Sequence, residues 1–294
     1  MAPKLSPAVA TLIGFTAIIL WSLLAALTAA AGPIPAFQMN AMCFGLGAGA
    51  AMLLRIRQPG RARALRQPFH VWAHGIIGLF GYHALYFAAL RLAPPAEASL
   101  VNYLWPLLIV LFSSLLPGER LRVFHIAGAL IGFAGVATLS INADLSARPE
   151  HALGYALAFA AALFWSAYSV LSRRMSNVPT DAVVGFCAAT ALLSLSCHLM
   201  FETTVWPASL GAWAAIVALG LGPVGAAFYA WDIGCKRGDI KLLGVSAYAA
   251  PVLSTLALVA SGFAQPSLAL WLACGLIVLG AIVASSDRLF ARRG

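Results

Sequence analysis

Aromatic residues with polar tips, accompanied by short polar side chains, recur inside long apolar stretches of this 294-residue sequence. Tryptophan and tyrosine rings offer large contact areas to flat or apolar molecules, and their N–H and O–H groups form hydrogen bonds with them. An aromatic face also attracts an amino group in its charged form. These residue types predict noncovalent recognition of a small molecule in a central cavity. The residues expected to line this cavity are Trp21, Tyr82, His83, Tyr86, Ser99, Asn102, Tyr103, Trp105, Trp165, Ser169 and Tyr248.

Ordinary packing, or a belt of rings at a membrane surface, is the competing interpretation of these aromatic residues. The belt is favoured for four tryptophans near the ends of apolar stretches: Trp72, Trp206, Trp213 and Trp271. The cavity is favoured for Trp21, Trp165 and Tyr103, which stand near the centres of their stretches. Asn102 and Tyr103 are costly in hydrocarbon unless they face protein or water, which also favours the cavity.

Three prolines inside apolar stretches are predicted to act as hinges or gates: Pro106, Pro223 and Pro251. A proline in a helix removes one backbone hydrogen bond and kinks the chain. A static kink is the alternative interpretation.

Charged side chains are scarce in the centres of the apolar stretches. No carboxylate stands clearly in the middle of one, whereas proton-driven carriers usually need such a group. We therefore expect transport without ion coupling, with His83 or Asp232 as the fallback proton sites. No central cluster of Lys or Arg is present either, so phosphorylated substrates are disfavoured.

Motifs for metal, cofactor or covalent chemistry are not found. The five cysteines form no CxxC pair, so neither a metal site nor a disulfide framework is expected, and no cofactor is predicted. An intramembrane enzyme would need a Ser/His pair, two membrane aspartates or an HExxH helix. We expect a protein that is not an enzyme, and an intramembrane enzyme remains the least favoured alternative.

The elements that must position these residues follow from composition. Hydrophobic residues make up 62% of the chain and charged residues 9%, with a mean hydropathy of +0.91, so the bilayer is the expected solvent. A membrane helix needs roughly 20 apolar residues. Apolar runs bounded by Pro, Gly or charge predict an all-α protein with ten transmembrane helices, over residues 8–30, 35–54, 71–91, 95–116, 121–141, 152–173, 180–201, 209–233, 240–262 and 267–286.

The distribution of basic residues predicts the orientation. With the N-terminus in the cytoplasm, 16 of the 18 Lys and Arg fall in cytoplasmic segments, and Arg91 and Arg148 are the exceptions. Cytoplasmic loops of membrane proteins carry such an excess. Both termini are therefore predicted to be cytoplasmic, in a bacterial inner membrane. The basic balance is thereby explained as an orientation signal, and nucleic-acid binding is not expected.

A weak internal repeat divides the chain into residues 1–142 and 150–294. Trp21-Ser22 recurs as Trp165-Ser166 at an offset of 144, and Tyr103-x-x-Pro106 recurs as Tyr248-x-x-Pro251 at an offset of 145. Five helices is an odd number, so consecutive halves must cross the membrane in opposite senses. Inverted repeats place a substrate site between the halves and allow two alternating gates, which predicts a transporter. Each half depends on the other for its core, so a monomer is expected to suffice as the transport unit.

Local motifs resemble the EamA repeat of the drug/metabolite transporter superfamily. They comprise Pro95-Ala96-Glu97-Ala98-Ser99 through Pro106, the loop Leu116-Pro117-Gly118-Glu119-Arg120-Leu121 and the run from Gly128 to Leu139. The second half, from Leu243 to Ala284, resembles this element more faintly and has Phe263-Ala264-Gln265 in place of the Gly-Glu-Arg loop. The resemblance implies the ten-helix architecture.

Within that superfamily the chain is most similar to aromatic amino-acid exporters of the YddG type. The segments Tyr82 to Tyr86 and Asn102-Tyr103-Leu104-Trp105-Pro106 carry this likeness. It implies export of aromatic and other neutral amino acids from a cavity between the repeats. A proton-coupled carrier of another substrate class is the main alternative. A channel or a lipid scramblase is a further one, which saturable flux would exclude.

Overall fold

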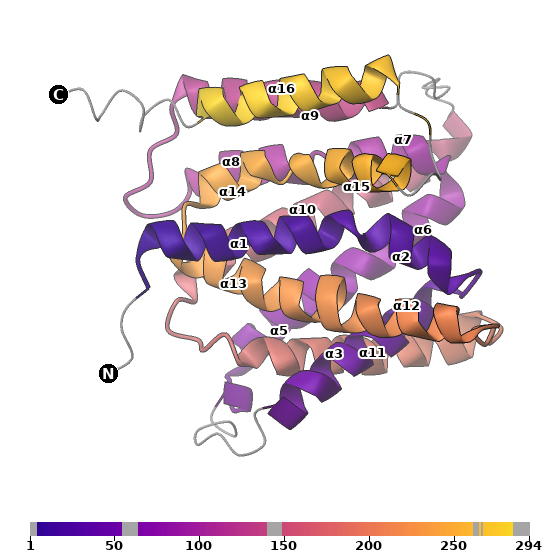
Figure 1. The fold of residues 1–294 in the computed structure, drawn as a ribbon. Helices are drawn as coiled ribbons and strands as arrows, with labels where there is room; N and C mark the ends of the chain where they lie inside the picture. The colour runs from indigo at the N-terminus through magenta and orange to yellow at the C-terminus, as the bar shows by residue number, and fades with distance from the viewer. Residues whose placement is uncertain (1–4, 55–63, 140–148, 261–264, 266, 285–294) are drawn as a thin grey trace.

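The computed structural model describes residues 5–54, 64–139, 149–260, 265 and 267–284, and every regular element in these ranges is helical. Seven helices are long and apolar enough to cross a membrane, and three further apolar helices are shorter. Helices run side by side across the molecule (Figure 1). The prediction of an all-α membrane protein is therefore confirmed, whereas the count of ten crossings stays a prediction.

The described residues of the first half form helices in the following order. They are α1 (Pro7–Ser22), α2 (Leu24–Ala31), α3 (Ala36–Leu54), α5 (Phe69–Ile76), η1 (Ile77–Gly81), α6 (Tyr82–Leu92), α7 (Pro95–Asn102), α8 (Trp105–Ser113) and α9 (Val123–Leu139).

The second half repeats this order with fewer interruptions. Its elements are η2 (Pro149–His151), α10 (Ala152–Arg174), α11 (Ala182–Phe201), α12 (Leu210–Leu221), η3 (Gly222–Ala226), α13 (Ala227–Arg237), α14 (Ile240–Ser246), α15 (Ala249–Ala260) and α16 (Leu268–Ala284). The predicted ends at residues 140–141, 261–262 and 285–286 lie outside the described residues.

Several predicted helices are divided in the structure. The fourth breaks at Tyr103 and Leu104, and Pro106 occupies the first turn of the helix that follows. A proline has no N–H for the carbonyl four residues earlier and is tolerated in a first turn, so the break lies just before it. The first predicted helix also breaks, at Leu23.

Two π-helical segments reveal the internal repeat more sharply than the sequence motifs do. Ile77–Gly81 and Gly222–Ala226 are the two π-helices of the described chain, and their first residues are 145 positions apart, as are their last. The breaks before α8 and α15 correspond in the same way, at an offset of 144. The two halves therefore share local backbone defects as well as helix order.

The halves run in opposite senses. Near the start of α1, the Thr11 hydroxyl accepts a hydrogen bond from the Asp239 backbone N–H, at 2.8 Å. At the end of α10, the equivalent helix of the second half, Arg173 donates to the Gly238 carbonyl. The turn at Gly238 and Asp239 therefore contacts both the beginning of α1 and the end of α10. Since the two helices have opposite ends at the same place, they are antiparallel.

Helix pairing also respects the repeat. The helices α3 and α11, and α9 and α16, are equivalent pairs that pack on each other, while α1 packs on α13 and α6 packs on α10 (Figure 1). Small residues permit the closest of these approaches. A Cβ atom on Gly128 would lie 2.5 Å from the Gly280 carbonyl oxygen, so α9 and α16 touch through their backbones.

Basic side chains gather at the end of the molecule where α1 begins, which we call the basic end. Lys241 pairs with Glu119 at 2.8 Å and donates to the Arg120 carbonyl, and Arg174 donates to the Leu115 carbonyl. Arg91 lies elsewhere, in a cluster with Glu202 at 3.0 Å. This separation agrees with the predicted charge asymmetry for the cations that the structure describes.

Candidate functional site: an aromatic cluster between the repeats

Four tryptophans from four different helices form a mutual contact group, which we call the tryptophan tetrad. Its members are Trp21 from α1, Trp105 from α8, Trp165 from α10 and Trp231 from α13. All six pairs are in ring contact, with centroid separations from 5.1 Å for Trp21 and Trp231 to 6.5 Å for Trp21 and Trp105. Segments from both halves of the chain therefore converge on a single point.

Hydrogen bonds fix the tetrad in place. The Trp21 indole N–H donates to the Pro223 carbonyl at 3.0 Å, within the π-helix η3. The Trp231 indole N–H donates to the Ser169 hydroxyl, also at 3.0 Å, so Ser169 supports a ring from a buried position. Buried indoles need such partners, because an unpaired N–H in an apolar interior is costly.

Two tyrosines of α6 stack on one another beside the tetrad. The rings of Tyr82 and Tyr86 are 6.0 Å apart and inclined by 13°, and the Tyr82 ring lies 5.4 Å from that of Trp165. Each hydroxyl meets a polar residue of α7. Tyr86 is hydrogen-bonded to Ser99 at 2.8 Å, and Tyr82 accepts from the Asn102 amide at 3.2 Å. These four side chains form a tyrosine ladder between α6 and α7.

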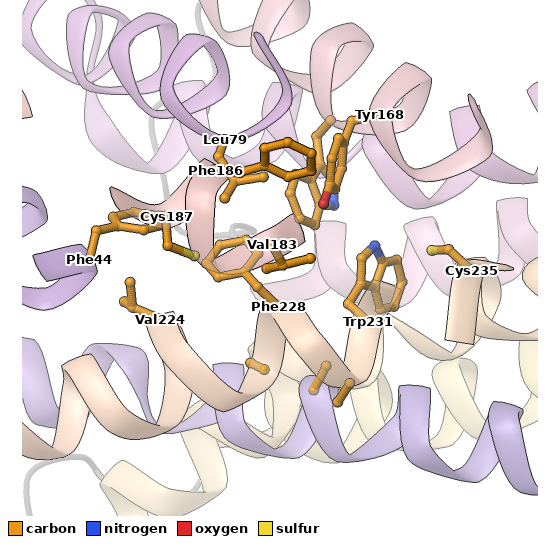
Figure 2. Close-up of a cluster of buried hydrophobic side chains, with 14 of the residues drawn as sticks. Phe44, Leu79, Tyr168, Val183, Phe186, Cys187, Val224, Phe228, Trp231 and Cys235 are labelled. Atoms are coloured by element: carbon orange, nitrogen blue, oxygen red, sulfur yellow. The ribbon is translucent and has the colours of Figure 1, made fainter. Parts of the chain in front are cut away.

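His83 extends the cluster toward α3 and α13. Its Nδ1–H donates to the Leu79 carbonyl at 2.7 Å. Its ring contacts Phe44, at a centroid distance of 5.3 Å, and Phe228, at 6.4 Å. Figure 2 shows Phe228 and Trp231 projecting from one helix toward Tyr168 and Phe186.

Tyr248 lies apart from this group. It is completely buried, packs against Phe133 at a centroid distance of 6.4 Å, and its hydroxyl accepts a hydrogen bond from the Leu107 backbone N–H at 3.1 Å. The first turn of α8 has no intrahelical partner for this N–H, so Tyr248 caps that helix from another part of the chain. Tyr103 belongs to the same apolar cluster as Tyr248 and, among the described residues, makes no ring contact with the tetrad.

The three predicted hinges stand at irregular backbone. Pro106 lies in the first turn after the break before α8, Pro251 in the first turn after the break before α15, and Pro223 within η3. A single structure shows the kinks and leaves their motion a prediction.

Between the tetrad and the basic end lies a buried ion pair. Lys236 Nζ is 2.9 Å from the Asp232 carboxylate, with 5% and 3% of the two side chains exposed. The same carboxylate accepts from the Thr180 hydroxyl at 2.7 Å, and Lys236 also donates to the Val178 carbonyl at 2.9 Å. The pair therefore ties α13 to the connection between α10 and α11.

A second polar cluster lies at the opposite end of the molecule, around Glu202. Its carboxylate accepts from the backbone N–H groups of Phe37 and Gln38, each at 3.0 Å, and thereby caps α3. His198 Nδ1 and Arg91 complete the site, also at 3.0 Å. Burial by itself raises the pKa of Glu202, but these hydrogen bonds and the Arg91 charge outweigh it and hold the pKa below its usual range.

Sequence reasoning missed Trp231, Tyr168 and Phe228. The repeat offset of 145 carries a signal for two of them, because it aligns Tyr86 with Trp231 and His83 with Phe228. Tyr168 is one helical turn beyond Trp165 on α10, and the two rings are 5.3 Å apart.

Comparison with known proteins agrees with this arrangement. The family model described as EamA-like transporter family matches residues 8–141 and 152–286. The chain belongs to this family. It is accordingly a multi-pass membrane transporter and not an enzyme, and the two matched segments coincide with the two structural halves.

Individual members of the family are similar to the chain over nearly its whole length. A protein named aromatic amino acid exporter YddG from Ancylobacter novellus is 58% identical, over 97% of this chain and 98% of that protein. A protein of the same name from Salmonella typhimurium is 28% identical, over 93% and 96%. A solved crystal structure with 58% identity superposes with a TM-score of 0.91, over 98% of this chain and all of that one.

Proposed function

We propose that the protein exports aromatic and other neutral amino acids across the bacterial inner membrane by alternating access. Ten crossings would place both termini on the same side of the membrane, and the excess of basic residues predicts that this side is the cytoplasm. The observation that carries the proposal is the meeting of the tryptophan tetrad and the tyrosine ladder between two antiparallel halves. The names of similar exporters support the substrate class.

The composition of the cluster suits such substrates. Indole and phenol rings can stack on an aromatic amino-acid side chain, and hydroxyl and amide groups of the ladder can bind its polar end. In the part of the chain that the structure describes, no Lys or Arg forms a hydrogen bond, ion pair or cation–π contact with the tetrad or the ladder. A phosphorylated substrate would lack the cationic partner that it needs.

The orientation of the substrate path follows from the two polar ends. Cytoplasmic loops are enriched in Lys and Arg, so the basic end faces the cytoplasm in this proposal. From the Glu202 end toward the basic end, the groups follow in the order tyrosine ladder, tetrad and buried pair of Asp232 and Lys236. In this proposal the tetrad closes the substrate site on its cytoplasmic side.

Uncoupled transport is the mechanism that these contacts favour. Asp232, one of the two fallback proton sites, is already paired with Lys236 and Thr180. His83, the other, donates to a backbone carbonyl and is packed among aromatic rings. Among the described residues, neither of them forms a hydrogen bond or an ion pair with the ladder.

Uptake of labelled phenylalanine, tryptophan and threonine into proteoliposomes, without an ion gradient, tests the proposal. We expect saturable flux of the amino acids and none of a sugar phosphate. Flux that requires an imposed proton gradient, or a substrate-driven pH change that disappears in His83→Ala or Asp232→Asn, would replace the uncoupled mechanism by proton coupling. A complete absence of amino-acid flux would overturn the substrate class.

A further inference from the structure

The side-chain carbonyl of Asn102 lacks a hydrogen-bond partner. Its Nδ2 donates to the Tyr82 hydroxyl at 3.2 Å, but within the described part of the protein no donor reaches Oδ1. The residue is only 4% exposed, so water does not readily satisfy this oxygen. Leaving a buried acceptor unpaired costs free energy, so a donor from a bound molecule is expected at this oxygen.

The backbone adds a second reason to expect a donor at this point. Asn102 is the last residue of α7, and Pro106 stands four residues later, where a continuous helix would supply an N–H to the Asn102 carbonyl. The end of α7 also carries the partial negative charge of a helix C-terminus. Two carbonyl oxygens of one residue thus lie where a cation is favoured.

The fold itself does not need an amide here. An offset of 145 aligns Asn102 with Ala247, and the last residue of α14, which matches the position of Asn102 at the end of α7, is Ser246. The second half therefore makes the same break without an amide side chain at either position. The amide therefore differs between the two repeats, and it occurs in the half that contains the tyrosine ladder.

We propose that Asn102 binds the α-ammonium group of the transported molecule through its side-chain Oδ1 and the backbone carbonyl at the end of α7. This inference rests on the proposed function and specifies how the substrate is chosen. A primary ammonium group offers three N–H donors, and the adjoining faces of Tyr82 and Trp165 add cation–π attraction.

The predicted substrate class is an aromatic or apolar molecule with a free primary ammonium group. A carboxylate is not required at this position. An N-acylated amino acid has lost the positive charge and keeps a single amide N–H, and an aryl carboxylic acid has no N–H donor at all. Sites built to hydrogen-bond one group discriminate strongly against analogues that lack it.

Competition for initial uptake of labelled phenylalanine into proteoliposomes of the full chain tests this assignment. The competitors are phenethylamine, N-acetylphenylalanine and 3-phenylpropionate. We expect phenethylamine to compete and the two compounds without an ammonium group to be weaker by about tenfold or more, as loss of a charged hydrogen bond implies. Equal competition by 3-phenylpropionate would overturn the inference, because it would indicate that the amide presents its N–H to a carboxylate.

Variants of Asn102 separate recognition from structural support. Asn102→Leu should weaken competition by phenylalanine and phenethylamine about tenfold and leave 3-phenylpropionate unchanged. Asn102→Asp keeps the acceptors and should strengthen the preference for phenethylamine. Thr190→Val is the matched control, because the Thr190 hydroxyl is also buried without a partner but lies outside the ladder and the tetrad, and it should preserve the order of competitors.

The outcomes distinguish this inference from the proposed function. Weakening of all competitors alike by Asn102→Leu, with no change of preference in Asn102→Asp, would show a structural residue and overturn the assignment. If Asn102→Leu is not monodisperse, Asn102→Asp alone decides. Wild-type protein that takes up no phenylalanine would overturn the proposed function, and the assignment with it.

Discussion

Trp21 and Trp165 stand 144 residues apart in the chain, yet their ring centroids are 5.6 Å apart and the ring planes cross at 75°. They are equivalent positions of the two halves, so their contact places them at the axis that relates the halves. In the proposed alternating-access cycle, contacts between equivalent residues of the two halves change as one half moves against the other. The tetrad is therefore the predicted meeting point of substrate binding and gating.

Replacing Trp165 by Phe should reduce amino-acid uptake while the protein stays inserted and monodisperse. The phenyl ring keeps an apolar face but loses much of the contact with Trp21, Tyr82 and Trp231. Trp165→Ala should reduce uptake further and cost about 3–5 kcal/mol of stability. Uptake into proteoliposomes and thermal unfolding in detergent measure the two effects.

Trp213→Phe is the matched control, because Trp213 is 40% exposed, stacks on Trp206 and has no ring contact with the tetrad among the described residues. It should leave uptake unchanged. An equal loss of uptake in both variants would mean that the tetrad is packing and not a binding surface.

Replacing Tyr248 by Phe should destabilise the protein and leave substrate preference unchanged. The Leu107 backbone N–H would lose its acceptor at the start of α8. An orphaned buried donor costs about 1–3 kcal/mol. Tyr103→Phe, at the equivalent position of the first half, is the control in thermal unfolding. An altered order of substrates in Tyr248→Phe would instead return Tyr248 to the substrate path.

Breaking the buried ion pair should cost more than removing it. Asp232→Leu or Lys236→Met alone leaves one uncompensated charge among apolar side chains, which costs about 3–5 kcal/mol. The double variant should be clearly more stable than the sum of the single effects suggests. Thermal unfolding of the four proteins forms the cycle. Strict additivity would show that the two side chains, 2.9 Å apart, do not interact.

Glu202 should make stability depend on pH. Because its folded-state pKa lies below the ordinary value of 4.5, its contribution is present above that value and is lost as the pH falls through the folded-state pKa. Wild type should therefore be more stable than Glu202→Gln at neutral pH, and the difference should shrink in acid. Glu150→Gln, whose native side chain is 66% exposed, is the control and should change stability little at neutral pH. A constant difference across pH would contradict the assignment.

Much of the architecture can be read from the chain. Apolar run length and the placement of Lys and Arg predicted the helices and the gathering of basic residues at one end. The offset shared by Trp21 and Trp165 predicted the repeat, and the structure displays it again in the two π-helices. These features depend on local composition and spacing, which a single sequence records.

The tertiary structure alone decided which polar groups meet. Tyr103 and Tyr248 share a motif, yet the hydroxyl of Tyr248 caps α8 and its ring fills an apolar cluster. Trp231 belongs to the tetrad, although the residues around it in α13 do not predict its contact with the other three tryptophans. Side-chain partners from distant helices are set by interhelical packing, and sequence spacing determines only the face on which a residue lies. The sequence also predicted Asn102 as a cavity residue, but only the tertiary structure showed that its side-chain oxygen has no partner.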